Sequence, residues 1–344
     1  MRRVIVNGRF LLRSRVTGVD RYARELLQEL DNRISSGEIE LAIPSTVKQI
    51  PEYKNIKVSS VGKLTNQLWE QISFPAYVRK KRGIALNLCN VAPLRTPGIV
   101  CIHDVKIKAR PQDFSKKFLL WYTILFANAC KKAEKIITVS EFSKKEICKY
   151  YKVDPNRIVV IPNAWQHFQR IGFDNTALQK YELPKGDFFF SVCSLEPNKN
   201  LRWIAESAKM NPEKTFAVAG AVNKKVFSEG LGFECPDNMR LLGYVSDEEA
   251  KTLMRDCEAF LFPSFYEGFG IPPMEAISAG CKNVMVSDTE VMHEVYGSDV
   301  DYIDPMKPSV LIMKTNEKGK TVLSNYSWKT SSEKLLHEVI QQVE

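Results

Sequence analysis

The chain has 344 residues, of which 44% are hydrophobic and 26% are charged. This composition excludes a disordered or fibrous protein and suffices for two globular domains of about 150 residues each. Residues 1–165 contain 30 Lys+Arg and 14 Asp+Glu, a net charge of +16, whereas residues 166–344 contain 19 and 26, a net charge of −7. The basic first half favours an anionic partner, either nucleic acid or a negatively charged membrane face, unless it is merely a solvated surface.

Neither the cysteines nor the apolar runs indicate secretion or membrane insertion. The eight cysteines are scattered without a Cys-x-x-Cys pair, and the first residues predict a strand instead of a signal peptide. The longest apolar run, Phe118 to Cys130, has 13 residues, whereas roughly 17 to 25 are needed to span a bilayer. We therefore expect a cytoplasmic protein without a transmembrane segment, and we expect this run to form a core helix.

Short apolar runs alternate with helical patterns in two series along the chain. The first series predicts buried strands at residues 4–6, 41–43, 84–86, 99–102, 136–139 and 158–161. The second predicts strands at residues 188–192, 216–219, 240–242, 259–262 and 284–286. Such alternation is typical of doubly wound, Rossmann-like α/β domains. We place the domains at residues 1–165 and 166–326, with a final helix at 327–344 that Ser327 caps.

Residues 265–276 form a strand, loop and helix junction that is rich in glycine and proline. Gly268 and Gly270 let the backbone approach a ligand closely, and Pro272-Pro273 fit the first turn of a helix. We expect the free N–H groups of that turn, together with the helix dipole, to favour an anion such as a diphosphate. An ordinary capped helix produces a similar pattern.

Two glutamates frame the same junction. Glu267 precedes the glycines and Glu275 lies in the predicted first helical turns. Carboxylates accept hydrogen bonds from hydroxyl groups, so these two side chains can hold the hydroxyls of a sugar and of a ribose. One site would then hold a whole nucleotide-sugar.

The complete pattern, Pro-Ser-x-Tyr-Glu-Gly-Phe-Gly-x-Pro-Pro-x-Glu-Ala, resembles the nucleotide-sugar motif of glycosyltransferase family 4. Members of this family have the GT-B fold, in which two Rossmann-like domains face a central cleft and a last helix returns to the first domain. Further similarities follow in the expected order over nearly the entire chain, at residues 15–22, 102–104, 139–143, 194–200, 216–220 and 242–246.

The resemblance implies a role for specific residues of the second domain. Lys199 would bind the diphosphate together with the backbone amides of Gly268, Phe269 and Gly270, while Glu267 would orient the sugar and Glu275 would bind the ribose. The segment with Tyr244 and Val245 would receive the nucleobase through backbone groups. Asn198 stands where many relatives have arginine, so the phosphate contact would depend on one cation.

In the first domain the resemblance implies two further site residues. Gly18 would approach the donor phosphates, and His103, in a His-Asp pair at the end of a predicted strand, would lie beside the transferred sugar. The other histidines, His167, His293 and His337, receive no role. A serine after a strand is first of all a helix cap, and we assign Ser140 that function.

The sequence contains one candidate metal site, Asp299-Val300-Asp301, which matches the Asp-x-Asp pattern of some glycosyltransferases. It lies far in sequence from the phosphate loops, and a short acidic turn explains it better. We therefore expect no required metal and no cofactor, since the nucleotide-sugar is a substrate.

The resemblance implies a retaining enzyme that moves a hexose from a nucleotide-sugar to a glycan or polyprenyl-linked acceptor during bacterial O-antigen, capsule or exopolysaccharide synthesis. We expect an anionic membrane surface as partner, with peripheral binding on the inner face, and no nucleic acid. Charge would mediate this contact through residues 79–82 and the lysine pairs that flank the apolar run. The alternatives are a GT-B epimerase or phosphorylase, a non-catalytic subunit, and a soluble acceptor. Sugar, nucleotide, acceptor and oligomeric state are left open.

Overall fold

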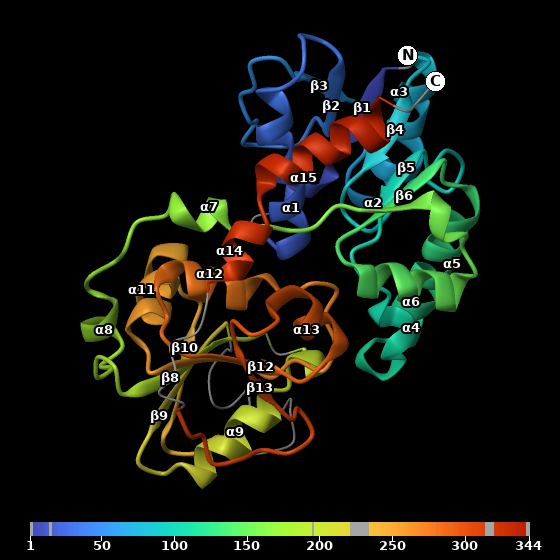
Figure 1. Cartoon of the computed structure of the whole chain (residues 1–344). Helices are drawn as coiled ribbons and strands as arrows, with labels where there is room; N and C mark the ends of the chain where they lie inside the picture. Colours follow the sequence, from blue (N-terminus) through green and yellow to red (C-terminus); the bar gives the residue numbers. More distant parts are fainter. Residues whose placement is uncertain (1–2, 14–15, 195, 221–233, 314–319, 342–344) are drawn as a thin grey trace. The chain divides into compact units, whose positions relative to one another are not determined.

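The computed structural model describes residues 3–13, 16–194, 196–220, 234–313 and 320–341 (Figure 1). The chain divides into two compact units: unit 1 comprises residues 1–163 and 328–344, and unit 2 comprises residues 164–327. Each unit contains one sheet, and every strand pair in both sheets is parallel. The prediction of a two-domain α/β fold is confirmed.

Unit 1 has a seven-stranded sheet in the order β3-β2-β1-β4-β5-β6-β7. The central strands are continuous apolar runs because helices cover both faces of a doubly wound parallel sheet; all four residues of β1, for example, are buried. The strands are β1 Val4–Asn7, β2 Ile39–Pro44, β3 Lys57–Val61, β4 Ile84–Asn87, β5 Ile99–Cys101, β6 Lys135–Thr138 and β7 Ile158–Val160.

The helices of unit 1 include one from the far end of the chain. Helix α15 (Trp328–Leu335) lies against α1 (Gly18–Asp31), and Trp328 meets the ring of Tyr22 edge-on at 5.9 Å (Figure 1). Ser140 caps α6 by accepting a hydrogen bond from the N–H of Ser143 at 3.0 Å, as predicted. The remaining helices are α2 Asn66–Leu68, a π-helical turn Trp69–Ser73, α3 Phe74–Lys80, α4 Lys106–Ala109, α5 Lys116–Lys132 and α6 Glu141–Tyr151.

Unit 2 has a six-stranded sheet in the order β10-β9-β8-β11-β12-β13. Aromatic residues of the central strand β8 dominate its core; Phe189, for example, packs edge-on against Phe216 at 4.9 Å. The strands are β8 Phe188–Val192, β9 Thr215–Ala219, β10 Met239–Gly243, β11 Ala259–Phe262, β12 Val284–Ser287 and β13 Asp301–Ile303. The helices are α7 Gln166–Gln169, α8 Ala177–Lys180, α9 Leu201–Met210, α11 Asp247–Asp256, α12 Ile271–Ala279, α13 Glu290–Tyr296 and α14 Thr321–Asn325.

The apolar runs do not predict β3 and β13, which lie at the edges of their sheets. Strand β3 has a lysine and two serines beside its two valines, and β13 has only three residues, one of them an aspartate, so neither forms an apolar run. The acidic sequence expected to form a turn ends in β13. Asp299 lies in the preceding bend and accepts a hydrogen bond from the N–H of Val322 at 2.6 Å, and Asp301 begins the strand. Both aspartates are buried, so this segment is part of the packing of unit 2.

The apolar run from Phe118 to Cys130 was expected to form a core helix. It forms most of α5, which lies at the surface of unit 1. Leu125, Phe126, Ala129 and Cys130 face the core, whereas Leu120 is 67% exposed and Ile124 45% exposed. One face of α5 covers the sheet, and the opposite face has no cover from unit 1. Among the described residues, no helix combines the length and hydropathy that crossing a membrane requires.

Candidate active site

The candidate site in unit 2 lies where its strand order reverses, between β8 and β11. Loops at the carboxyl ends of two such strands separate, and ligands of open α/β sheets bind there. The loop after β8 contains Lys199 and the loop after β11 contains Glu267. Lys199 Nζ and Glu267 Oε1 are 2.7 Å apart, and the ammonium also lies 5.4 Å from the ring centre of Phe262. Two residues predicted for different parts of a donor thus form one ion pair.

The pair keeps Lys199 charged. Burial disfavours the ammonium, but the attraction and hydrogen bond of the Glu267 carboxylate outweigh it and raise the pKa of Lys199 above its ordinary value. An ammonium has three N–H donors, and one is directed at Glu267. Lys199 can therefore bind a phosphate while its partner fixes its position.

Asn198 connects the same two loops. Its backbone carbonyl accepts the N–H of Phe265 at 2.9 Å, and its side-chain amide donates to the carbonyl of Tyr266 at 2.7 Å. Asn198 is buried. Asn198 therefore connects the loop that contains Lys199 with the loop that contains Glu267.

Glu275 lies in the second turn of α12, and its partner is His167 of α7. His167 Nε2 and Glu275 Oε1 are 2.7 Å apart, and the histidine is buried. The sequence analysis gave His167 no role because 108 residues separate the two side chains and no local pattern connects them. The contact orients the carboxylate of Glu275 and leaves Oε2 to meet a hydroxyl.

The start of α12 offers fewer free N–H groups than the sequence analysis expected. Two of its first four residues are the prolines, which have no N–H, and the N–H of Met274 donates to the hydroxyl of Tyr296 at 3.1 Å. Tyr296 in turn donates to the carbonyl of Gly270. Within the first turn, Ile271 keeps the single N–H without a partner among the described residues. Anion binding here therefore depends on the preceding loop and on Lys199 more than on the helix.

The glycine-rich loop is tightly packed at its end. Gly270 has φ +83°, and a Cβ there would lie 2.6 Å from the terminal carbon of buried Met292. The Phe269 ring packs edge-on against Tyr326 at 5.2 Å, and Gly268 is buried as well. Past β10, Tyr244 is 69% exposed and Val245 is half-buried. Leu195, which belongs to the motif at residues 194–200, lies outside the described residues.

We expect Gly270→Ala to destabilise unit 2 more than Gly280→Ala. Both positions have positive φ, where alanine costs about 1–2 kcal/mol, but a Cβ at Gly280 meets no atom within 4 Å. At Gly270 the contact with the terminal carbon of Met292 adds a further cost, because that side chain is buried and has little room to shift. Thermal unfolding of the two variants measures the difference, and equal midpoints would contradict the proposed clash.

In unit 1, His103 follows β5 at the carboxyl edge of the sheet. Its Nε2 lies 2.8 Å from the carbonyl of Leu88, and the ring of Tyr22 packs edge-on against it at 4.7 Å. Burial lowers the pKa of His103 below its ordinary value, so the imidazole is neutral at neutral pH. A carbonyl only accepts, so Nε2 carries the proton and Nδ1 is the acceptor.

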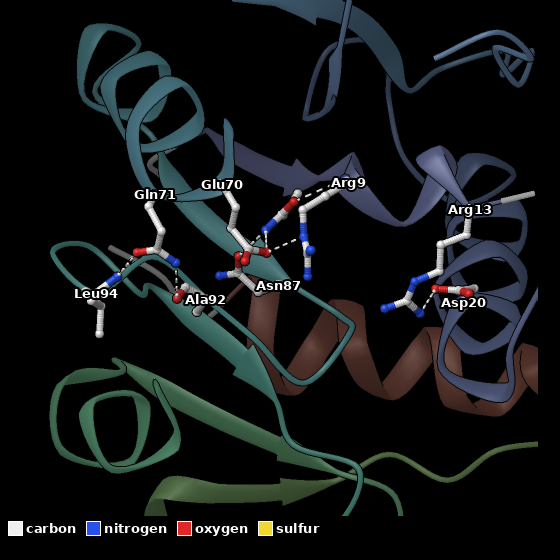
Figure 2. A network of polar contacts seen from close by, with 9 residues as sticks. Arg9, Arg13, Asp20, Glu70, Gln71, Asn87, Ala92 and Leu94 are labelled. Carbon is white, nitrogen blue, oxygen red and sulfur yellow. Dashed lines mark hydrogen bonds and ion pairs between the residues drawn. The ribbon is translucent and has the colours of Figure 1, made fainter. Parts of the chain in front are cut away.

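Gly18, the other predicted residue of unit 1, is the exposed first residue of α1. Earlier in the chain, Arg13 donates from Nη1 to Asp20 Oδ1 of α1 at 2.8 Å, as Figure 2 shows. Asp20 also accepts the N–H of Thr17 at 3.0 Å. Arg15 of the same motif lies outside the described residues. Neither unit, in its described part, contains three or more His, Cys, Asp or Glu side chains grouped as metal ligands.

Two Rossmann-like α/β units in one chain are the architecture of a GT-B protein. Solved GT-B structures match the chain along its whole length. The Anabaena protein HepE in complex with UDP and glucose has a TM-score of 0.69 at 16% identity and covers 100% of both chains. WaaG, a glycosyltransferase involved in lipopolysaccharide biosynthesis, has a TM-score of 0.64 at 14% identity, over 98% of this chain and 90% of its own. At these identities the likeness establishes the fold.

Two family models match consecutive parts of the chain. Residues 16–165 match Glycosyltransferase Family 4, and residues 174–307 match Glycosyl transferases group 1. The chain therefore belongs to the group 1 glycosyltransferases of the family 4 type, as its motifs predicted.

The relatives include two proteins named for O-antigen synthesis. The O-antigen chain mannosyltransferase RfbU of Salmonella typhimurium is 30% identical over 217 residues, which are 62% of this chain and 58% of that protein. The O-antigen chain mannosyltransferase B of Escherichia coli is 26% identical over 325 residues and 84% of each chain. The match thus spans less than two thirds of the Salmonella protein.

Proposed function

We propose that this protein is a retaining hexosyltransferase that transfers a sugar, mannose in the first instance, from a nucleotide-sugar to a growing bacterial surface polysaccharide. The observation that carries the proposal is the ion pair of Lys199 and Glu267 at the strand reversal of unit 2, next to the oriented carboxylate of Glu275. The names of the two O-antigen mannosyltransferases support the sugar and the pathway.

Each group of unit 2 has a part in this transfer. Lys199 neutralises the departing diphosphate, whose negative charge grows as the glycosidic bond breaks, and a fixed cation requires little reorganisation. Glu267 holds Lys199 and uses its second oxygen to orient the sugar. Glu275, positioned by His167, accepts hydrogen bonds from the ribose. Retention of anomeric configuration follows from the family resemblance, with a leaving phosphate oxygen taking the acceptor proton on the same face.

Nucleotide release from a panel of UDP, GDP and dTDP sugars, with mannose donors included, tests the activity. We expect slow release without an acceptor from the correct donor. An epimerase would change the sugar's configuration, and a phosphorylase would require inorganic phosphate. A non-catalytic subunit would release nothing from any donor, and that result would refute the proposal.

The two glutamates should have separable effects. Glu275→Ala and His167→Ala should each weaken binding of the free nucleotide by about tenfold, because both act on the ribose, and the double variant should lose little more. Glu267→Ala should lower turnover with less effect on nucleotide affinity. Calorimetry with the free nucleotide measures these affinities. Equal losses in the Glu267 and Glu275 variants would contradict separate roles.

Lys199→Ala should lower the rate at least tenfold, which corresponds to about 1.4 kcal/mol, since the cation acts on charge that develops in the transition state. Lys209→Ala is the matched control, because Lys209 forms a similar pair with Glu206 at 3.0 Å on the surface of α9. We further propose that no metal is required, so EDTA should change the wild-type rate little. Loss of activity in EDTA with rescue by magnesium would contradict this second claim.

We also propose that unit 1 binds an anionic membrane that carries the acceptor. On α5, Leu120 and Ile124 are exposed between the lysine pairs at 116–117 and 131–132. A groove of about 550 Å³ beside this helix is lined by Lys108, Lys131, Lys152 and Arg157 together with two tyrosines, and no acidic side chain lines it. Arg79, Lys80 and Arg82 are exposed as well. Charge alone was expected to make this contact, and the exposed apolar face of α5 now adds to it.

Binding to liposomes should therefore require anionic lipid and weaken as salt rises, with each lysine near the surface contributing roughly 1 kcal/mol. Changing Leu120 and Ile124 together to Ser should lower binding about tenfold, because less apolar surface enters the lipid. The control is Met306→Ser, an equally exposed apolar residue of unit 2. Equal recovery with neutral and anionic liposomes at low salt would favour a soluble acceptor.

A further inference from the structure

A second polar site lies at the carboxyl edge of unit 1, where the strand order reverses between β1 and β4. Asn7 ends β1 and Asn87 ends β4, and Asn7 Nδ2 donates to Asn87 Oδ1 at 2.9 Å. A cavity of about 10 Å³ opens beside them, and its lining includes Arg9 and Glu70. Glu70 comes from the π-helical turn that precedes α3. Figure 2 shows Arg9, Glu70 and Asn87 directed toward one another.

The hydrogen bonds within this cluster do not use all of its donors and acceptors. Glu70 is 3% exposed, and its Oε1 accepts from Asn7 Nδ2 at 2.9 Å and from Arg9 Nε at 3.0 Å. The Asn87 amide donates to two backbone carbonyls. Among the described residues, Glu70 Oε2 and the two terminal nitrogens of Arg9 have no hydrogen-bond partner. The site therefore offers one charged acceptor and several charged donors around a single small cavity.

The volume of the cavity and the charges of its lining limit which chemical group can bind there. A volume near 10 Å³ holds about one water-sized oxygen. A phosphate oxygen would meet the negative charge of Glu70, and the two arginines of the lining already pair with carboxylates, Arg9 with Glu70 and Arg13 with Asp20. A hydroxyl group donates and accepts at once, so it can donate to Glu70 Oε2 and accept from Arg9. Hydrogen bonds to charged groups contribute about 1.5–3 kcal/mol each, which is enough to position a sugar.

Leu88 connects the cavity with His103, the residue expected beside the transferred sugar. Leu88 lines the cavity, and the carbonyl of Leu88 is the group that accepts from His103 Nε2. Resting on the function proposed above, we infer that Glu70 and Arg9 bind one hydroxyl of the acceptor sugar and hold that sugar beside His103. They act as positioning residues that set acceptor affinity, because the charges that develop on the donor lie at the groups of unit 2.

The test uses the full chain and its best donor, with methyl glycosides of mannose, glucose, galactose and N-acetylglucosamine as soluble acceptors. At least one glycoside should accelerate nucleotide release above the rate with water. Glu70→Gln keeps the size of the side chain but removes its charge, and it should raise the half-saturating glycoside concentration about tenfold. Arg9→Lys should do the same, because lysine lacks the planar fork of donors. Acceptor-independent release is measured for each variant, so that every saturation curve is compared with its own baseline.

Gln71→Ala is the matched control. Gln71 neighbours Glu70 on the same helical turn but bonds to Ala92 and Leu94, away from the cavity (Figure 2). This variant should lower the thermal unfolding midpoint without changing glycoside saturation. Unchanged saturation in Glu70→Gln, an equal change in Gln71→Ala, or a wild type that no glycoside accelerates would each overturn the inference. Failure of the proposed function itself looks different, since acceptor-independent release would then be absent for every donor.

Discussion

The parallel order of the strands, with one reversal in each sheet, determines where the two polar clusters of this protein form. Side chains within the strands are buried in the cores. Polar groups can therefore cluster at the carboxyl ends of the strands, where neighbouring loops run in opposite directions. Unit 2 places Lys199 and Glu267 at its reversal, and unit 1 places Asn7 and Asn87 at its own. The two units thus use the same architectural position for different chemistry.

Both positions combine a cation with a carboxylate, but they differ in which of the two charged groups is available to a ligand. At Lys199 the ion pair leaves ammonium donors for an anion, and Asn198 fixes the loops that hold it. At Arg9 the carboxylate of Glu70 is nearly buried and keeps one free oxygen, which disfavours anions and favours hydroxyls. The first arrangement suits a diphosphate and the second suits a sugar. Such a division matches an enzyme with one charged and one neutral substrate group.

The sequence predicted the fold well because central parallel strands are continuous apolar runs. It missed β3 and β13, which are edge strands with little apolar surface, and it placed the apolar run of α5 in the core although half of that helix faces outward. The motif residues lie in the expected loops, but their partners do not follow from any local pattern. His167, Tyr296 and Glu70 reach their contacts from distant parts of the chain.

The sequence pattern predicted free N–H groups at the start of α12, but most of them are absent or already bonded. Proline favours the first helical turn and at the same time removes the donors that would make this turn an anion site. Tyr296 then occupies the N–H of Met274. The loop geometry is therefore stabilised from within unit 2, and the proposed phosphate contact depends on the side chain of Lys199.

The ion pair of Lys199 also affects the reactivity of its amine. A lysine attacks acylating reagents only as the neutral amine, and the carboxylate of Glu267 raises the pKa of Lys199 and so lowers the neutral fraction. Exposed lysines on the surface of α5 have no comparable carboxylate in the same position. Amine-directed labelling for microscopy or immobilisation should therefore modify the outer lysines first and spare the site.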